Sequence, residues 1–368
     1  MSDSRAIDEA MLRRALELAR RGIGHVEPNP PVGAVIADDQ GRVLGEGWHE
    51  RFGGAHAEIH ALAAAGESAR GATLFVTLEP CCHFGKTPPC TRAVIAAGIR
   101  RVVIATTDPA THGTGRGVDE LKAAGIDVEV GVLGDDAQRL IAPFTRLSTT
   151  GLPWMYAKWA MTLDGKSATT TGSSQWISNS SSRSIVHELR GRMDAVVTGI
   201  GTVIADDPLL TARPAGPRLA TRIVLDSLCR IPITSQLVRT AGDVHVLVVT
   251  TEFAPTDRIE ALQQAGVEVL VLAHTSNRQP DLQELARELG RRRMTNVLIE
   301  AGGKLLGSLF DQRLVNEVHA FIAPLLVGGH GAPTPLAGTG VDLMSNAARL
   351  EQTEIRLLDG DVYVRGVV

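Results

Sequence analysis

A histidine, a glutamate and three cysteines in the first part of the chain have the residue types of a catalytic zinc site. His56 and Glu58 form a His-Ala-Glu pattern, and Cys81, Cys82 and Cys90 follow in the segment TLEPCCHFGKTPPC. A catalytic zinc takes three nitrogen or sulfur ligands from the protein and keeps its fourth position for water. One imidazole and two thiolates meet that requirement, and Glu58 could move protons there without binding the metal. Zinc nucleobase deaminases combine His-x-Glu with Pro-Cys-x-x-Cys in this way.

Each of these residues also has an ordinary structural explanation. A single His-Ala-Glu occurs by chance, and a buried cysteine often packs as a small apolar side chain. Three of the four cysteines nevertheless crowd into ten residues, which in a reducing compartment favours a metal or catalytic site over disulfide bonds. The spacing from Cys81 to Cys90 is longer than the generic signature requires. The residues together predict a zinc site but leave open which two cysteines bind the metal.

The length and composition predict two globular domains and neither a nucleic-acid nor a membrane partner. The 368 residues exceed the size at which one hydrophobic core stops growing. A formal net charge of -4 provides no basic field, and 4% aromatic residues leave few rings for stacking on bases. No apolar run approaches the roughly 20 residues that span a bilayer. The N-terminal segment lacks the apolar core of a signal peptide, so a cytoplasmic location is expected.

Helices and strands that could position the zinc site alternate along the first half of the chain. Apolar periodicity predicts a helix at 7–21, and a hairpin is predicted from strands at 32–36 and 43–47. The pattern further predicts helices at 56–65, 91–97 and 135–147 and one ending at 124, with strands at 73–77, 101–105 and 128–132. This alternation indicates a three-layer α/β domain. His56 and Glu58 would begin a helix, and the cysteine cluster would follow a strand.

The alternation starts again after a seam at residues 149–153. Strands are predicted at 154–161, 195–198, 223–226, 244–249, 268–271, 297–300 and 318–323, and helices at 180–190, 258–265, 282–289 and from 303 onward. The final stretch predicts two antiparallel strands at 354–358 and 362–367, which would form the edge of a second α/β domain. We therefore predict two domains, residues 1–148 and 149–368.

Several longer segments resemble one known family, the bifunctional enzymes of riboflavin biosynthesis that join a pyrimidine deaminase to a reductase. HAE, TLEPCCHFGKTPPC, PNPPVGAVI and GEGWHERFGGAHAE resemble the deaminase domain, including its long cysteine spacing. KWAMTLDGKSAT, GSSQWIS, TGIGTVIADDPLLTAR, VLDS and LIEAGGKLLGSL resemble the reductase domain. The resemblance implies an N-terminal cytidine-deaminase-like three-layer α/β/α domain and a C-terminal dihydrofolate-reductase-like α/β domain.

The same resemblance assigns residues to the deaminase site. It implies zinc ligation by His56, Cys81 and Cys90 and proton transfer by Glu58. Cys82 neighbours a ligand without a task of its own, so we interpret it as structural. The resemblance also implies that the substrate pocket is lined by Asn29, His49, His83 and Lys86. An amide such as Asn29 can hydrogen-bond a pyrimidinone edge, and a lysine can meet a phosphate. The alternatives are that Asn29 only shapes a turn and that Lys86 is only solvated.

The reductase half needs a hydride donor but lacks a G-x-G-x-x-G fingerprint after the first strand of either half. The segment 300–308, EAGGKLLGS, follows a predicted strand and opens a helix, so its glycines could admit phosphates to the helix N-terminus. The resemblance places NADPH against Ala160, Trp176, Thr202, Asp206, Ser227, Gly302, Gly303, Lys304, Leu305, Leu306, Gly307 and Ser308. It places the phosphoribosyl substrate against Ser174, Arg190, Leu210, Arg213 and Glu300. Trp176 could equally be structural, and Asp206 a solvated carboxylate.

The activity that the resemblance implies has two steps. The first is hydrolytic deamination of 2,5-diamino-6-(5-phospho-ribosylamino)pyrimidin-4-one, and the second is NADPH-dependent reduction of the ribosyl chain to ribityl. This gives 5-amino-6-(5-phospho-ribitylamino)uracil. Glu300 is a candidate for proton transfer during the reduction. We also expect a homo-oligomer, either a dimer or a tetramer.

Two other functions fit the residues less well. A deaminase of tRNA or free nucleobases with an accessory domain is disfavoured by the acidic balance and by the glycine turns of the second half. A zinc- or nucleotide-binding regulator without catalysis is disfavoured by the presence of Glu58, which zinc binding alone does not require.

Overall fold

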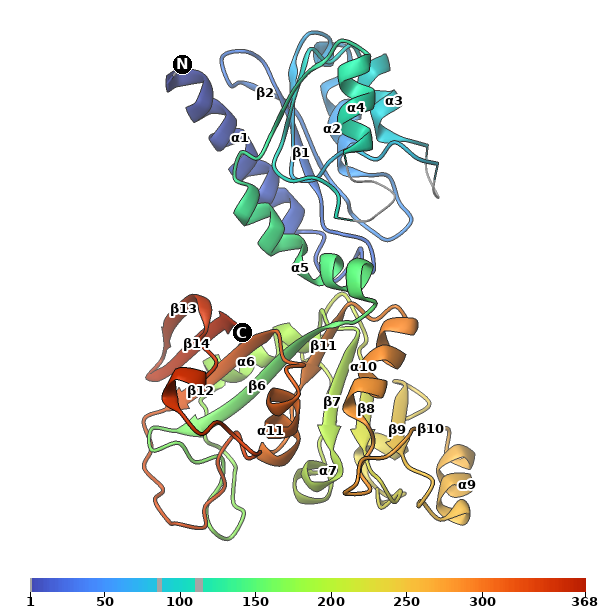
Figure 1. Cartoon of the computed structure of the whole chain (residues 1–368), viewed down its shortest axis with the longest axis vertical. Helices are drawn as coiled ribbons and strands as arrows, with labels where there is room; N and C mark the ends of the chain where they lie inside the picture. Colours follow the sequence, from blue (N-terminus) through green and yellow to red (C-terminus); the bar gives the residue numbers. More distant parts are fainter. Residues whose placement is uncertain (1, 85–87, 110–114) are drawn as a thin grey trace. The chain divides into compact units, whose positions relative to one another are not determined.

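The computed structural model describes residues 2–84, 88–109 and 115–368, without the side chains of residues 2 and 3. The chain folds into two compact units, Met1–Gly151 and Leu152–Val368 (Figure 1). Within the described ranges, no helix combines the length and the apolar character needed to cross a bilayer. Both units are mixed α/β structures, as the sequence predicts.

The first unit is built on a five-stranded sheet with the order β2-β1-β3-β4-β5. Its strands are β1 (Gly33–Ala37), β2 (Val43–Trp48), β3 (Thr73–Val76), β4 (Arg101–Ile104) and β5 (Asp127–Val130). Its helices are α1 (Ser2–Arg20), α2 (Ala57–Ala65), η1 (Gly66–Ala69), α3 (Cys90–Ala96), α4 (Arg116–Ala123) and α5 (Gly134–Thr150). The predicted hairpin is confirmed, since β1 pairs antiparallel with β2, while β3, β4 and β5 run parallel.

Helices cover both faces of this sheet and make the three layers that the sequence predicts (Figure 1). α1 and α5 pack on one face through residues such as Leu12 and Ala137, and α2, α3 and α4 pack on the other through residues such as Ala61 and Leu121. β1 is buried along its whole length, which explains its uninterrupted apolar run. Gly47 lets α2 lie directly on β2, because a Cβ at this position would come within 2.5 Å of the Ala57 carbonyl oxygen.

The second unit contains a nine-stranded sheet with the order β10-β9-β8-β7-β11-β6-β12-β14-β13. Its strands are β6 (Trp154–Thr162), β7 (Ala195–Gly199), β8 (Thr221–Leu225), β9 (Val246–Thr250), β10 (Glu268–Val271), β11 (Asn296–Ile299), β12 (Glu317–Ala323), β13 (Glu351–Leu358) and β14 (Asp361–Val367). Its helices are α6 (Ser180–Arg190), α7 (Ile200–Asp206), α8 (Gln236–Arg239), α9 (Thr256–Gln264), α10 (Leu282–Arg291), α11 (Gly303–Asp311) and η2 (Met344–Asn346).

The second sheet is also covered on both faces (Figure 1). α10 and α11 pack on one face, and α6, α7, α8 and α9 pack on the other. The strands from β10 to β12 are parallel, and β14 and β13 add an antiparallel edge, as predicted. Because β7, β8, β11 and β6 are parallel neighbours, the loops that follow them gather at one edge of the sheet.

Several helix ends differ from their predictions by a few residues, and the end of α5 bears on the predicted domain boundary. α5 continues through Thr150, three residues beyond the predicted end at 147, so the predicted domain boundary after residue 148 falls in its last turn. The hydroxyls of Thr149 and Thr150 donate to carbonyl oxygens one turn earlier. The helix ends at Gly151, whose φ of 70° suits glycine.

Candidate functional site

The residues predicted to bind zinc come from three neighbouring segments of the first unit. His56 caps the N-terminus of α2, and Glu58 lies in the first turn of that helix. Cys81 belongs to the loop after β3, and Cys90 is the first residue of α3. The close approach of α2 to β2 fixes the histidine end of this group, and the loop after β3 brings the cysteines to the same place.

The atoms that would ligate a metal lie at a spacing that fits zinc. His56 Nδ1 is 3.2 Å from Cys90 Sγ and 3.5 Å from Cys81 Sγ, and all three atoms lie within 4.8 Å of one another. Tetrahedral Zn–N and Zn–S bonds put neighbouring ligand atoms about 3.5 Å apart. The described residues contain one cluster of at least three histidine, cysteine or acidic side chains at such spacing, made of His56, Cys81 and Cys90. Cys82 is not in the group and instead faces the charges of Arg116 and Glu120.

Hydrogen bonds prepare Cys81 to act as a thiolate. The Cys90 thiol donates to the Cys81 sulfur, and the Cys90 backbone N–H at the start of α3 donates to it at 3.3 Å. Together with His56, these groups lower the pKa of Cys81 to about 4 against the opposing effect of burial. The pKa of Cys90 is raised, because its thiol is the donor of that bond and is buried. A thiolate is the form in which cysteine binds a metal.

Glu58 and His49 are buried beside the three ligand atoms. Burial raises the pKa of Glu58, whose carboxyl interacts with His56, Cys81 and the Cys90 side chain. A raised carboxyl pKa suits a group that must accept and then release a proton near neutral pH. The His49 ring lies 5.3 Å from the His56 ring, and burial lowers the pKa of His49 and keeps it neutral.

For the other predicted substrate residues of this unit that are described, the structure gives a place in the fold but no contact with the three ligand atoms. Asn29 is half-buried in the loop before β1, and His83 is exposed in the loop between Cys81 and Cys90. Lys86 lies outside the described residues. The assignment of these three side chains to a substrate pocket stays a prediction.

Glu79 is a buried residue of this site that the sequence analysis did not single out. Its carboxylate accepts four backbone N–H groups, from Asp108, Gly115, Gly117 and Val118. These bonds tie the loop that carries Cys81 to the residues that follow β4 and open α4. The sequence signal was the acidic residue before Pro-Cys, but its partners lie more than 25 residues away and cannot be read from spacing.

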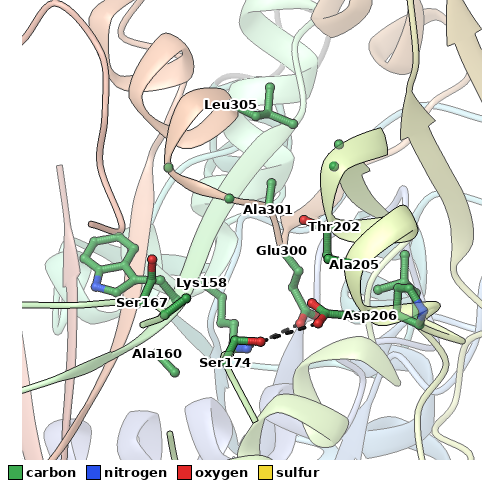
Figure 2. A pocket seen from close by; sticks show the side chains of 18 of the residues that line it. Lys158, Ala160, Ser167, Ser174, Thr202, Ala205, Asp206, Glu300, Ala301 and Leu305 are labelled. Atoms are coloured by element: carbon green, nitrogen blue, oxygen red, sulfur yellow. Dashed lines mark hydrogen bonds and ion pairs between the residues drawn. The ribbon is translucent and has the colours of Figure 1, made fainter. Parts of the chain in front are cut away.

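The second unit has a cavity of about 1140 Å³ at the edge where its parallel strands end (Figure 2). The loops after β7, β8 and β11 line it, together with part of β6. The predicted reductase residues found in its lining are Ala160, Ser174, Trp176, Arg190, Thr202, Asp206, Leu210, Arg213, Ser227, Glu300, Gly302, Gly303, Lys304, Leu305 and Ser308. Open parallel sheets bind ligands at this edge.

Two residues predicted to bind the cofactor do not line the cavity. Leu306 is fully buried in the hydrophobic core beneath α11, and Gly307 packs against the backbone of Ala337. The reason is helical periodicity: α11 begins at Gly303, so its fourth and fifth residues turn toward the sheet and the neighbouring loop. The contiguous stretch read from the sequence therefore reaches the cavity only at its first residues and at Ser308.

Glu300 carries the central charge of the cavity. Its carboxylate is 8% exposed and accepts Arg190 Nε at 2.6 Å and Nη2 at 2.9 Å, with Lys158 Nζ at 3.5 Å. Burial alone would raise the pKa of Glu300, but the charges of Arg190 and Lys158 outweigh it and lower the pKa to about 2. Figure 2 shows Lys158 and Glu300 facing each other across the cavity floor, near Ser174 and Asp206. The Ser174 hydroxyl donates to Asp206 at 3.4 Å.

Several cationic or titratable residues of the cavity were missed by the sequence analysis. Lys158, Arg183, His187 and Arg230 all line it. The Arg183 guanidinium lies 4.7 Å over the exposed Trp176 ring. Lys158 stands inside the KWAMTLDGKSAT segment, so its type was visible, but only the pairing of β6 with β11 brings it to Glu300.

Comparison with known proteins finds a family for each part of the chain. Residues 153–364 match the family model described as the RibD C-terminal domain, and residues 5–106 match the cytidine and deoxycytidylate deaminase zinc-binding region. The chain is 40% identical to riboflavin biosynthesis protein RibD of Actinobacillus pleuropneumoniae, over 97% of this chain and 94% of that protein. It is 39% identical to RibD of Escherichia coli, over 96% of this chain and 98% of that protein.

Solved structures with similar folds span the full chain. RibD of Acinetobacter baumannii superposes with a TM-score of 0.86 at 36% identity and covers 99% of both chains. A diaminohydroxyphosphoribosylaminopyrimidine deaminase/5-amino-6-(5-phosphoribosylamino)uracil reductase of Thermotoga maritima superposes with a TM-score of 0.84 at 34% identity, over 98% of both chains.

The folds and sites define a zinc-dependent deaminase joined to an NADPH-dependent reductase in one chain. The predicted fold classes, cytidine-deaminase-like and dihydrofolate-reductase-like, are confirmed. More particularly, the chain belongs to the RibD family, the bifunctional deaminase/reductases of riboflavin biosynthesis.

The geometry of the three ligand atoms predicts a specific pattern of metal content. Protein purified without chelator should contain about one zinc per chain by mass spectrometry. Cys81→Ser and Cys90→Ser should each remove most of that zinc, because each takes away a thiolate. Cys82→Ser is the matched control and should keep it. Loss of zinc from the Cys82 variant alone would contradict the assignment.

Proposed function

We propose that the chain first hydrolyses the 2-amino group of 2,5-diamino-6-(5-phospho-ribosylamino)pyrimidin-4-one and then reduces the ribosyl chain of the product to ribityl with NADPH. The observation that carries this proposal is the coexistence of two chemically distinct sites. One has the donor set of a catalytic zinc beside a buried glutamate. The other is a large cavity with a glycine-opened helix and several cationic groups.

In the deamination, Glu58 would do the proton transfers. Zinc held by His56, Cys81 and Cys90 would supply a water of lowered pKa, near 7. Glu58 takes a proton as the C–O bond forms, and returns it to the amino nitrogen as the C–N bond breaks. The products are the carbonyl compound and ammonia, so the atoms of one water are consumed. Burial of Glu58 supports this role, because its raised pKa lets it hold the proton between the two steps.

In the reduction, the protein would mainly hold donor and acceptor in position. When bound, NADPH would supply a hydride for the sugar C1′ of the opened imine form, and the imine nitrogen would gain its proton from water. The lowered pKa of Glu300 supports a role as a permanent carboxylate that orients Arg190 and Lys158, and it argues against the proton-donor role considered from the sequence. Backbone N–H groups at the start of α11 could meet the cofactor phosphates.

Glu58→Gln should lower deamination by about a thousandfold, because the general acid and base is lost. The variant should keep its zinc and should still oxidise NADPH with the deaminated substrate. Release of ammonia, metal content and NADPH absorbance measure the three properties. The exposed Glu67→Gln, one turn beyond α2, is the control and should behave like the original protein. Normal deamination by the Glu58→Gln variant would show that Glu58 is not the general acid and base.

We also propose that residues 1–148 carry the deamination and residues 149–368 the reduction. Each unit has its own sheet and its own hydrophobic clusters, which supports independent function. A fragment ending at Gly151, where α5 ends, should deaminate without NADPH, and a fragment from Leu152 should oxidise NADPH with the deaminated substrate. If both fragments fold by circular dichroism but neither is active, the division of labour is wrong.

We propose further that the protein forms a homo-oligomer through the edge of the second sheet. Among the described residues no strand pairs with the outer edge of β13, and its Ile355 and Leu357 are 67% and 79% exposed on one face. Leu343 and Met344 expose more apolar surface in the preceding segment. Apolar surface beside a sheet edge favours association.

Light scattering after size-exclusion chromatography should give a dimer or a tetramer for the original protein. Ile355→Lys combined with Leu357→Glu should lower the mass toward the monomer. Leu219→Glu, which changes an equally exposed leucine before β8, should not alter it. A monomeric original protein would refute the proposal.

Finally, we propose a cytoplasmic location and a small-molecule substrate without a nucleic-acid partner. All four cysteines are free, which fits a reducing compartment. The net charge of -4 supports the absence of nucleic acid.

A further inference from the structure

The two arginines assigned to the substrate are not equally available to it. The Arg190 guanidinium is held by the protein, since Nε and Nη2 bond to Glu300 and Nη1 donates to the Thr211 carbonyl at 3.3 Å. Arg213 is exposed, and within the part of the chain that the structure describes its Nη1 makes one long hydrogen bond, at 3.3 Å, to the Thr211 hydroxyl. A guanidinium with free N–H groups binds an anion better than one whose fork already holds a carboxylate. Arg213 is therefore the stronger candidate for the phosphate end of the substrate.

The backbone that carries Arg213 is held in an unfavourable conformation. Leu210 is buried in the hydrophobic core with a φ of 56°, which leucine rarely adopts. Such residues persist only where surrounding contacts hold them. The position of Arg213 can therefore depend on the contacts that residues 211–213 make with α6.

His187 provides one of these contacts. It lies one helical turn before Arg190 on α6, lines the same cavity, and accepts the backbone N–H of Arg213 on Nδ1 at 3.3 Å. A backbone amide can only donate, so Nδ1 carries no proton and the neutral ring has its proton on Nε2. Burial and the charges of Arg190 and Arg213 lower the pKa of His187, while the Thr211 carbonyl and Glu300 act in the opposite sense. The ring is thus neutral and suited to accept this bond.

We propose that His187 is a positioning residue of the reductase site: it fixes residues 211–213 on α6 so that the Arg213 guanidinium meets the anionic phosphate end of the substrate. The inference rests on the proposed function. It assigns to His187 no contact with the reacting atoms, and it predicts an effect on recognition of the phosphate with no effect on hydride transfer.

The test uses the full-length protein with the deaminated substrate in its phosphorylated and dephosphorylated forms. His187→Leu removes the acceptor at nearly constant volume, and the KM for the phosphorylated form should rise about tenfold, the usual worth of one hydrogen bond. The kcat, the KM for NADPH and the kcat/KM for the dephosphorylated form should change little. His187→Asn, whose amide oxygen can replace Nδ1, should restore most of the lost affinity.

A double-mutant cycle distinguishes positioning from a general structural role. If His187 acts through Arg213, then His187→Leu should cause no further loss once Arg213→Ala is present. Equal losses for both substrate forms, or additive losses in the double variant, would overturn the proposal. Failure of the original protein to reduce the phosphorylated substrate would refute the proposed function itself, and that result is seen before any variant is made.

Discussion

The Glu300 carboxylate stands directly after β11, nearly out of contact with water, and it accepts both arms of the Arg190 guanidinium. A carboxylate buried in this way is tolerated only while its cationic partners remain in place, because an uncompensated buried charge costs several kcal/mol. Arg190 comes from α6 and Lys158 from β6, so one charge balance fixes three elements around the cavity. If Lys158 and Arg190 moved away, Glu300 would remain as a buried carboxylate without a cationic partner. The shape of the reductase cavity depends on this interaction.

In the first unit, a buried carboxylate is stabilised by backbone N–H groups instead of cationic side chains. Glu79 is also buried, and its oxygens accept four N–H groups from the segments that follow β4. The loop carrying Cys81 is therefore tied to a neighbouring loop without a second side-chain charge. In both units, a buried carboxylate near the end of a parallel strand gathers distant segments at the functional edge.

The two sites differ in how much of their chemistry the protein itself supplies. In the deaminase unit the reactive groups are few and close, and Glu58 is buried so that its pKa favours proton exchange. In the reductase unit the cavity is large, its central charge on Glu300 is paired with Arg190 and Lys158, and its residues bind and orient. A cavity of this kind depends on positioning, so residues such as His187 that hold other side chains acquire importance.

Much of the first site could be predicted from the sequence, because its information is local. A helix that begins at His56 puts Glu58 in its first turn, and a strand followed by Pro-Cys puts Cys81 at a sheet edge. The residue types alone then indicated zinc chemistry. The choice between Cys82 and Cys90 was not local, since the residues left it open and only family spacing suggested an answer. In the structure, α3 begins at Cys90 and turns that residue toward His56, whereas Cys82 faces Arg116 and Glu120.

Resemblance named many residues of the second site, but only the tertiary structure decided how they meet. Arg190 and Glu300 are separated by 110 residues, and they meet because β7 and β6 flank β11 in the sheet. Strand order depends on the packing of the whole unit, so no spacing in the sequence reveals it. The same holds for the direction of a side chain on α11, where Leu305 reaches the cavity and Leu306 enters the core. Residue types therefore determined which chemistry the chain could perform, while long-range packing determined which of those residues share a site.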